Sequence, residues 1–292
     1  MRSDPREFEL VTPGSLSAVL DLLAREPADW TPFAGGTDLM VLYGAGKLAG
    51  RRFVSVWELP ELRRIETTPE ELRIGAACTY SDIRRNETIQ SEFPLLTAAA
   101  SWTGGIANQN RGTLGGNIVN ASPAADSLPA LLAYEAAVVL VSNRGARTVP
   151  YTDFHSGYKT HALKSDELIQ TIVLSRRYAN YFAYGRKAGA RNAQAISKVC
   201  IAGLAKLEGK VITDIRIGMG SVAPVPLRLR DTETLVLGKP VTPSTISEAK
   251  RSVARQIQPI DDIRSTAAYR TAVAENHVAE FLEKLQEQTG VA

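Results

Sequence analysis

Apolar residues recur along this chain at two spacings, one typical of helices and one typical of strands. Leu16, Val19, Leu20 and Leu23 follow Ser15 at helical intervals, and Ser15 is a suitable N-cap residue. Similar patterns predict further helices at residues 80–85, 95–102, 128–134, 246–256 and 266–286. Alternating or β-branched runs predict strands at residues 30–34, 52–56, 72–76 and 137–141. The chain therefore mixes helices and strands, as expected for the α+β class.

The last third of the chain carries the longest predicted strands, at residues 197–207 and 210–222. Glu208-Gly209 joins them and predicts a hairpin turn. A spacing of two places one set of side chains of the second strand on a single face, namely Val211, Thr213, Ile215, Ile217 and Met219. We therefore expect an antiparallel sheet, packed against the two C-terminal helices.

Two breaks in the pattern divide the chain into three parts. The first lies at Glu58-Leu59-Pro60 and the second near Arg176-Arg177-Tyr178. A length of 292 residues exceeds that of most single domains, which agrees with such a division. The expected units are residues 1–57, 58–177 and 178–292.

Composition excludes several classes of protein. Charged residues make up 22% of the chain and the net charge is only +3, with basic and acidic residues well mixed, so nucleic acid is not an expected partner. The only cysteines, Cys78 and Cys200, cannot supply the four thiolates of an iron–sulfur cluster. The charged start of the sequence and the short, interrupted apolar stretch at residues 128–141 predict a cytoplasmic location.

Two glycine-rich segments carry the candidate chemistry. One runs from Thr113 to Asp126 and the other from Pro32 to Leu39, and each contains a Gly-Gly pair without lysine or arginine. Each pair alone is compatible with a simple turn or strand end. Together they could hold a diphosphate from two sides, because glycines allow close approach and successive N–H groups bind phosphate oxygens. Neither segment has the spacing of a Rossmann fingerprint or of a P-loop.

Four blocks of the sequence, in this order, carry a resemblance to a known family: 34–38, then 111–117 with 121–126, then 154–160 with 166–169, and finally 187–199. The chain resembles the FAD-binding medium subunit of molybdenum hydroxylases, a family that includes the flavin subunit of bacterial carbon monoxide dehydrogenase and the flavin domain of xanthine dehydrogenase. The resemblance implies a two-part FAD-binding region of the PCMH type, similar to vanillyl-alcohol oxidase. A C-terminal α+β domain with an antiparallel sheet and helices would follow.

The resemblance also implies which residues bind FAD. The first loop would hold one side of the pyrophosphate through backbone N–H groups, with Pro32, Phe33, Ala34, Gly35, Gly36, Thr37, Asp38 and Leu39. The second would hold the other side in the same way, with Thr113, Leu114, Gly115, Gly116 and Asn117. No catalytic residue and no metal ligand are expected, and His155 and His161 lack partners in a ligand pattern.

Three further residues have an implied role and an ordinary alternative. Asp126 resembles an aspartate near the nucleotide end of the cofactor, or else caps the helix that starts near residue 128. Ile169 matches a position whose backbone lies near the isoalloxazine ring, or is a core residue. Lys187 would place positive charge near the pyrimidine edge and stabilise the reduced ring, or is a solvated surface lysine.

The sequence departs from the xanthine dehydrogenases at two positions of the implied site. Thr103 stands where those enzymes have a phenylalanine that stacks on the flavin. Asn192-Ala193-Gln194 replaces an acidic run in the loop near the ring, a loop that influences the use of NAD. NAD is therefore not the expected acceptor.

The implied function is that of an FAD subunit in a molybdenum hydroxylase complex. A large partner would hold the molybdopterin cofactor, a small partner would hold two [2Fe-2S] clusters, and electrons would leave through FAD to an external acceptor, in a dimer of heterotrimers. One alternative is a self-contained flavin oxidase of the same superfamily. Another is a flavin-free assembly scaffold, which would not need intact glycines in both loops. Because the resemblance implies that another subunit selects the substrate, heteroaromatic compounds, aldehydes, carbon monoxide and acyl thioesters all stay open. The acyl-thioester version usually carries an extra cluster in this subunit, so the cysteine count disfavours it.

Overall fold

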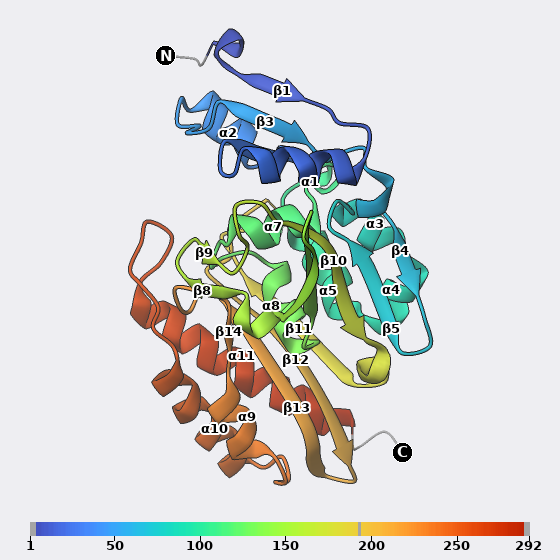
Figure 1. The fold of residues 1–292 in the computed structure, drawn as a ribbon. Coiled ribbons are helices and arrows are strands. Elements are labelled where there is room, and N and C mark those ends of the chain that lie inside the picture. The colour runs from blue at the N-terminus through green and yellow to red at the C-terminus, as the bar shows by residue number, and fades with distance from the viewer. Residues whose placement is uncertain (1–3, 192–193, 289–292) are drawn as a thin grey trace.

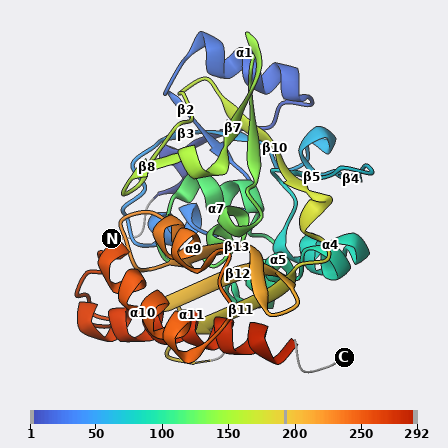
Figure 2. The same ribbon diagram turned by 90° about the horizontal axis from the view of Figure 1, so that it is seen from below.

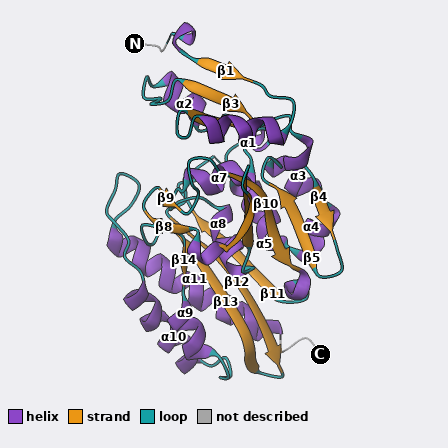
Figure 3. Cartoon of the chain, in the orientation of Figure 1, coloured by secondary structure: helices purple, strands orange, loops and turns teal. Residues whose placement is uncertain are grey.

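A computed structural model describes residues 4–191 and 194–288. In this part of the chain three larger sheets follow one another, each with its own helices, and two short strands form a separate two-stranded sheet (Figures 1 and 3). The first is a parallel sheet of order β1-β3-β2. Its part of the chain contains η1 (Pro5–Glu7), β1 (Glu9–Val11), α1 (Leu16–Arg25), β2 (Trp30–Phe33), α2 (Leu39–Gly44) and β3 (Arg52–Ser55).

The apolar pattern around Ser15 gives the predicted helix. The Ser15 hydroxyl accepts the N–H of Ala18 at 3.2 Å, which caps α1. The four apolar residues predicted from the helical spacing are the buried residues of α1. They pack on this first sheet and on its junction with the second, where Val141 and Leu168 belong to the same apolar cluster.

The middle sheet is antiparallel, with the order β4-β5-β10-β6-β7. Its strands are β4 (Ile65–Thr67), β5 (Glu71–Gly75), β6 (Ala137–Ser142), β7 (Gly145–Pro150) and β10 (Leu168–Ser175). The turn η2 (Pro60–Leu62) precedes these strands. The segments between them form α3 (Tyr80–Arg85), α4 (Glu87–Glu92), α5 (Pro94–Trp102), α6 (Ile106–Gln109), α7 (Leu114–Asn120), α8 (Ser127–Ala133), η3 (Tyr151–Asp153), β8 (His155–Gly157) and β9 (Thr160–His161).

The C-terminal sheet is also antiparallel and has the order β11-β12-β13-β14. After η4 (Arg176–Tyr178), this part contains β11 (Phe182–Ala188), β12 (Val199–Glu208), β13 (Val211–Gly220), β14 (Leu227–Arg228), α9 (Arg230–Val236), α10 (Pro243–Gln256) and α11 (Ala267–Glu287). Figure 2 shows α10 and α11 on the side of this sheet that faces away from α7. The predicted α+β class, with an antiparallel C-terminal sheet and helices, is confirmed.

The predicted face of β13 is wrong at its first positions. Val211 and Thr213 are exposed, whereas Ile212 is buried with Ile215 and Ile217. The register shifts opposite Lys206 and Leu207 of β12, so one extra residue of β13 interrupts the alternation. A β-bulge therefore moves the start of β13 by one position relative to the simple pattern.

Helix α8 lies between the middle sheet and the C-terminal sheet. All seven of its residues are buried, and they pack on β12 and β13. Glycines in β13 allow the close approach: a Cβ on Gly218 would lie 2.3 Å from the carbonyl oxygen of Pro129. Gly220 is equally restricted, by Pro129 and by the Sγ of Cys200. The helix therefore has no exposed face and packs against both parts.

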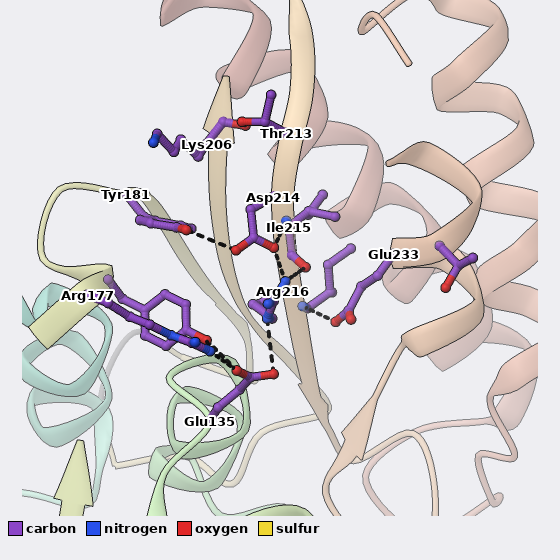
Figure 4. A network of polar contacts seen from close by, with 12 residues as sticks. Glu135, Arg177, Tyr181, Lys206, Thr213, Asp214, Ile215, Arg216 and Glu233 are labelled. Carbon is purple, nitrogen blue, oxygen red and sulfur yellow. Dashed lines mark hydrogen bonds and ion pairs between the residues drawn. The ribbon is translucent and has the colours of Figure 1, made fainter. Parts of the chain in front are cut away.

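An ionic network at the end of α8 connects the same two parts (Figure 4). Glu135 accepts from Arg216 at 3.1 Å and from Arg228 at 3.2 Å, both from the C-terminal part. It also accepts from the Tyr178 hydroxyl and pairs with Arg177. Burial would raise the pKa of Glu135, but the Tyr178 hydroxyl and these guanidinium groups outweigh burial and lower the pKa to about 2. Glu135 therefore acts in its ionised form.

Candidate cofactor-binding site

The two glycine-rich segments predicted to act together are in direct contact. A Cβ on Gly35 would lie only 1.6 Å from the carbonyl oxygen of Arg111, so only glycine fits there. The Nε of Arg111 also donates to the carbonyl oxygen of Gly35 at 3.4 Å. Farther along, the Asn120 side chain donates to Asp38 at 3.3 Å. The structure thus brings the first loop against the segment that leads into α7.

The first loop presents free backbone donors. Within the described ranges, no protein acceptor takes the N–H groups of Gly35, Gly36, Thr37 or Asp38. Gly36 has a φ of +74°, a conformation that glycine adopts at little cost. Successive free N–H groups around a residue of positive φ form the kind of concave surface that binds phosphate oxygens. The loop therefore matches the implied role of a diphosphate cradle.

The second loop differs from the expectation that it also offers N–H groups. The N–H of Leu114 donates to Cys78 and that of Gly115 to Ala76, at 3.0 and 2.9 Å. The Thr113 hydroxyl takes the N–H of Gly116, and the Thr113 carbonyl takes that of Asn117. These amides are used because the segment starts a helix and borders the strand end at Gly75. Four of the five predicted amides are therefore occupied within the protein, and the role of this loop in holding a diphosphate stays a prediction.

Thr103 and Ile169 both have local roles in the structure. The hydroxyl of Thr103 donates to the carbonyl of Ala99 at 2.8 Å, at the end of α5. Ile169 is 5% exposed and packs in the core of the middle sheet, which favours the core interpretation for its side chain. A bulge follows it in β10, between Ile169 and Thr171.

Lys187 and Asp126 form one buried ion pair. Lys187 Nζ lies 2.7 Å from Asp126 Oδ2, and the two side chains are 6% and 8% exposed. Lys187 also donates to the Trp102 carbonyl at 3.1 Å. The solvated-surface interpretation of Lys187 is therefore wrong. Asp126 occupies the N-cap position of α8, but its side chain makes no capping hydrogen bond.

This pair also corrects the implied map of the cofactor. The sequence placed Asp126 near the nucleotide end and Lys187 near the pyrimidine edge. Two side chains joined by a 2.7 Å ion pair cannot mark opposite ends of one extended dinucleotide. They mark a single location, to which the middle part contributes Asp126 and the C-terminal part contributes Lys187.

The residue that follows Asp126 makes a hydrogen bond to the second glycine loop. Ser127, next to Asp126, donates to the Asn117 side chain at 2.7 Å. The Tyr80 hydroxyl lies 3.4 Å from the Ser127 hydroxyl. Burial raises the pKa of Asp126, while the Lys187 ammonium and the Ser197 hydroxyl act in the opposite direction. Ser127, which follows Asp126 in the sequence, therefore connects Asn117 to the start of α8, and cofactor binding by Asn117 and Asp126 stays a prediction.

Four residues at the site were not singled out from the sequence. Arg111 lies over the Trp57 ring at 3.9 Å and packs against the first loop. Asn120 bridges Asp38 to Lys159, whose Nζ donates to it at 2.6 Å. Ser197 donates to Asp126. Arg111, Lys159 and Ser197 stand inside blocks of the family resemblance, and this position was the available signal.

These features define a class of protein. An α+β chain in which two glycine segments meet, one with free amides, is suited to binding a nucleotide cofactor through its diphosphate. Among the described residues, no three His, Cys, Asp or Glu side chains are arranged to hold a metal ion. None of the described helices is long and apolar enough to cross a membrane.

Comparison with known proteins gives the particular family. Residues 6–175 match the model of the FAD binding domain in molybdopterin dehydrogenase. Residues 184–285 match the CO dehydrogenase flavoprotein C-terminal domain. The chain belongs to this family of FAD-binding subunits of molybdenum-dependent oxidoreductases, as its resemblance implied.

Individual relatives support this membership over nearly the whole length. The glyceraldehyde dehydrogenase medium chain of Sulfolobus acidocaldarius is 33% identical, over 92% of this chain and 95% of the relative. The xanthine dehydrogenase FAD-binding subunit of Escherichia coli O157:H7 is 30% identical, with 88% of each chain covered. A chain in a structure of carbon monoxide dehydrogenase from Hydrogenophaga pseudoflava superposes with a TM-score of 0.91 at 28% identity, covering 95% of this chain and 96% of that one.

Proposed function

We propose that this chain carries electrons from the [2Fe-2S] clusters of a small partner subunit to an external acceptor other than NAD. A large partner would hold the molybdopterin cofactor and oxidise the substrate, and the complex would be a dimer of heterotrimers in the cytoplasm. Support comes from relatives named as medium chains or FAD subunits of dehydrogenases. When bound, FAD supplies the one- and two-electron chemistry that this role needs.

One observation carries the proposal: the free N–H groups of Gly35, Gly36, Thr37 and Asp38. Fixed amide dipoles bind an anion without a mobile charge, so they can hold a diphosphate. Pro32, Phe33, Ala34 and Leu39 would shape this loop. Gly35 keeps it against Arg111, because any larger residue would separate the two segments.

The second segment would position the cofactor through its shape and side chains. Thr113, Leu114, Gly115 and Gly116 fix the start of α7, and Asn117 connects it to Ser127. Thr103 and Ile169 border the same region in the proposed site. Asp126 and Lys187 would contribute a compensated charge pair where the middle and C-terminal parts meet.

The choice of acceptor rests on the loop that follows β11. Asn192 and Ala193 lie outside the described residues, so support comes from their uncharged side chains in the sequence. The proposed division at residues 57/58 and 177/178 follows the order of the three sheets.

The proposal predicts that the purified full chain carries FAD in a 1:1 ratio. The chromophore would be released by denaturation and identified by mass, and the chain would then be titrated with reduced iron–sulfur partner while flavin absorbance is followed. Bleaching of the flavin band by the partner is the expected result. A folded chain that takes up no FAD, even in the presence of both partners, would instead indicate a flavin-free scaffold. Bleaching by small organic substrates without any partner would indicate a self-contained oxidase.

A further inference from the structure

Asp126 is held from two sides by groups of the C-terminal part. Lys187 on β11 binds one carboxylate oxygen, Oδ2, and the Ser197 hydroxyl donates to the other, Oδ1. Ser197 is itself completely buried. Its carbonyl accepts from the Ser221 hydroxyl at 2.9 Å, a contact that does not involve Asp126. The hydroxyl of Ser197 is therefore a direct, buried partner of the carboxylate.

The ammonium of Lys187 keeps one donor for a ligand. A lysine has three N–H donors. Among the described residues, Lys187 uses one on Asp126 and one on the carbonyl of Trp102. The ammonium is 2.7 Å from a carboxylate. A ligand that accepts a hydrogen bond from the third donor is therefore next to both charges of the ion pair and not next to an isolated positive charge. The state of Asp126 therefore determines the charge that such a ligand meets.

We propose that Ser197 is a positioning residue that keeps Asp126 ionised and aligned against Lys187, and that it thereby sets the reduction potential of the bound flavin. This inference rests on the proposed function, because it requires FAD next to Lys187. A hydrogen bond to a carboxylate favours its charged form. A carboxylate that loses this bond in a buried site takes up a proton more readily, and the Lys187 charge then remains uncompensated.

The other groups around Asp126 leave it as the group that titrates. Burial raises the pKa of Tyr80 on α3, and burial likewise raises the pKa of the Cys200 thiol on β12, so both stay neutral in the physiological range. Asp126 itself is pulled upward by burial and downward by Lys187 and Ser197. Removal of the Ser197 hydroxyl takes away one of the two groups that favour the carboxylate.

The test is the midpoint potential of the bound FAD as a function of pH, measured on the full chain. Asp126→Asn removes the negative charge, and we expect the ratio of affinities for reduced and oxidised flavin to rise about tenfold, which is about 30 mV for a two-electron couple. Ser197→Ala should match wild type at high pH and approach the Asp126→Asn value at lower pH. Ser197→Thr keeps a hydroxyl and should restore the wild-type profile.

Ser221→Ala is the matched control, because it removes a hydroxyl that supports the backbone of Ser197 without touching Asp126. The profile of this variant should equal that of wild type. If Ser197→Ala and Ser221→Ala shift the profile equally, Ser197 has only a structural role and the inference fails. Wild-type-like potentials in Asp126→Asn at every pH, with FAD still bound, would also overturn it. Absence of FAD from the wild-type chain would overturn the proposed function as well.

Discussion

The two Gly-Gly pairs look alike in the sequence and have different physical roles. Gly35 and Gly36 have no acceptor for their N–H groups among the residues that the structure describes, and a side chain on Gly35 would overlap another loop. Gly115 and Gly116 have their N–H groups bonded within the protein. A Cβ on Gly115 would lie 2.6 Å from the Cβ of Ala76. The first pair is therefore suited to contact a ligand, and the second to close packing beneath it.

The strongest test of this contrast is Gly35→Ala. The added methyl would overlap the Arg111 carbonyl, so the loops must separate and the free amides move. We expect FAD affinity to fall about 100-fold or more, since two hydrogen bonds to a charged group contribute about 1.5–3 kcal/mol each. Fluorescence titration with FAD measures the loss. Gly14→Ala is the control, because nothing lies within 4 Å of its Cβ position.

Gly115→Ala should mainly lower the free energy of unfolding, whereas Gly35→Ala mainly lowers FAD affinity. Its methyl would meet Ala76 in the core, and overpacking of this kind costs about 1–3 kcal/mol. Urea unfolding of the flavin-free chain measures the free energy of unfolding directly. Gly44→Ala adds the same methyl in α2 where nothing lies within 4 Å, and should not destabilise the chain. A Gly115→Ala chain of wild-type stability would contradict the packing role.

Acid should weaken the ionic network around Glu135. Glu135 follows the end of α8 and accepts from Arg216 and Arg228 of the C-terminal part. Because the pKa of Glu135 is lowered, the ionised carboxylate stabilises the folded chain at pH values above about 4.5. This stabilisation is lost as the pH falls toward about 2. The loss should be about 1 kcal/mol or less, because solvent screens this partly exposed carboxylate.

Urea midpoints between pH 5 and about 2.5 measure this acid effect. In Glu135→Gln the midpoint should depend less on pH over that interval. Glu208→Gln, at the exposed end of β12, should keep the wild-type slope. An unchanged slope in Glu135→Gln would show that other carboxylates determine the acid sensitivity.

The smallest expected effect is that of Asn120→Ala. Asn120 bridges Asp38 and Lys159 at the surface between the two segments. Removal of such an exposed contact should change stability by less than about 0.5 kcal/mol. FAD affinity should fall only about twofold, as measured by the same titration. A loss comparable to that of Gly35→Ala would mean that side chains rather than amides hold the first loop.

Local patterns predicted the elements well. The helix expected at residues 80–85 is Tyr80–Arg85, and the one expected at 246–256 begins three residues earlier, at Pro243. The face of β13 could not be predicted, because a bulge depends on pairing with β12 and not on the spacing within β13. The proposed domain boundaries stay a prediction.

The site was predictable in its residues more than in its arrangement. The sequence indicated both glycine segments, and the structure places them in contact. It could not show which amides are free, because the acceptors for the second loop, Cys78 and Ala76, lie far away in sequence. Likewise, the meeting of Asp126 with Lys187 depends on the docking of two sheets across α8, which no local pattern encodes.

The burial of α8 has a consequence for how such subunits can be recombined. A chimera that takes its C-terminal part from a relative would pair a foreign sheet with the native α8, whose Pro129 carbonyl needs glycine at position 218. The helix and the C-terminal sheet must therefore come from the same parent protein. A fusion point before Asp126 keeps them together, whereas a fusion point between the middle and C-terminal sheets separates them.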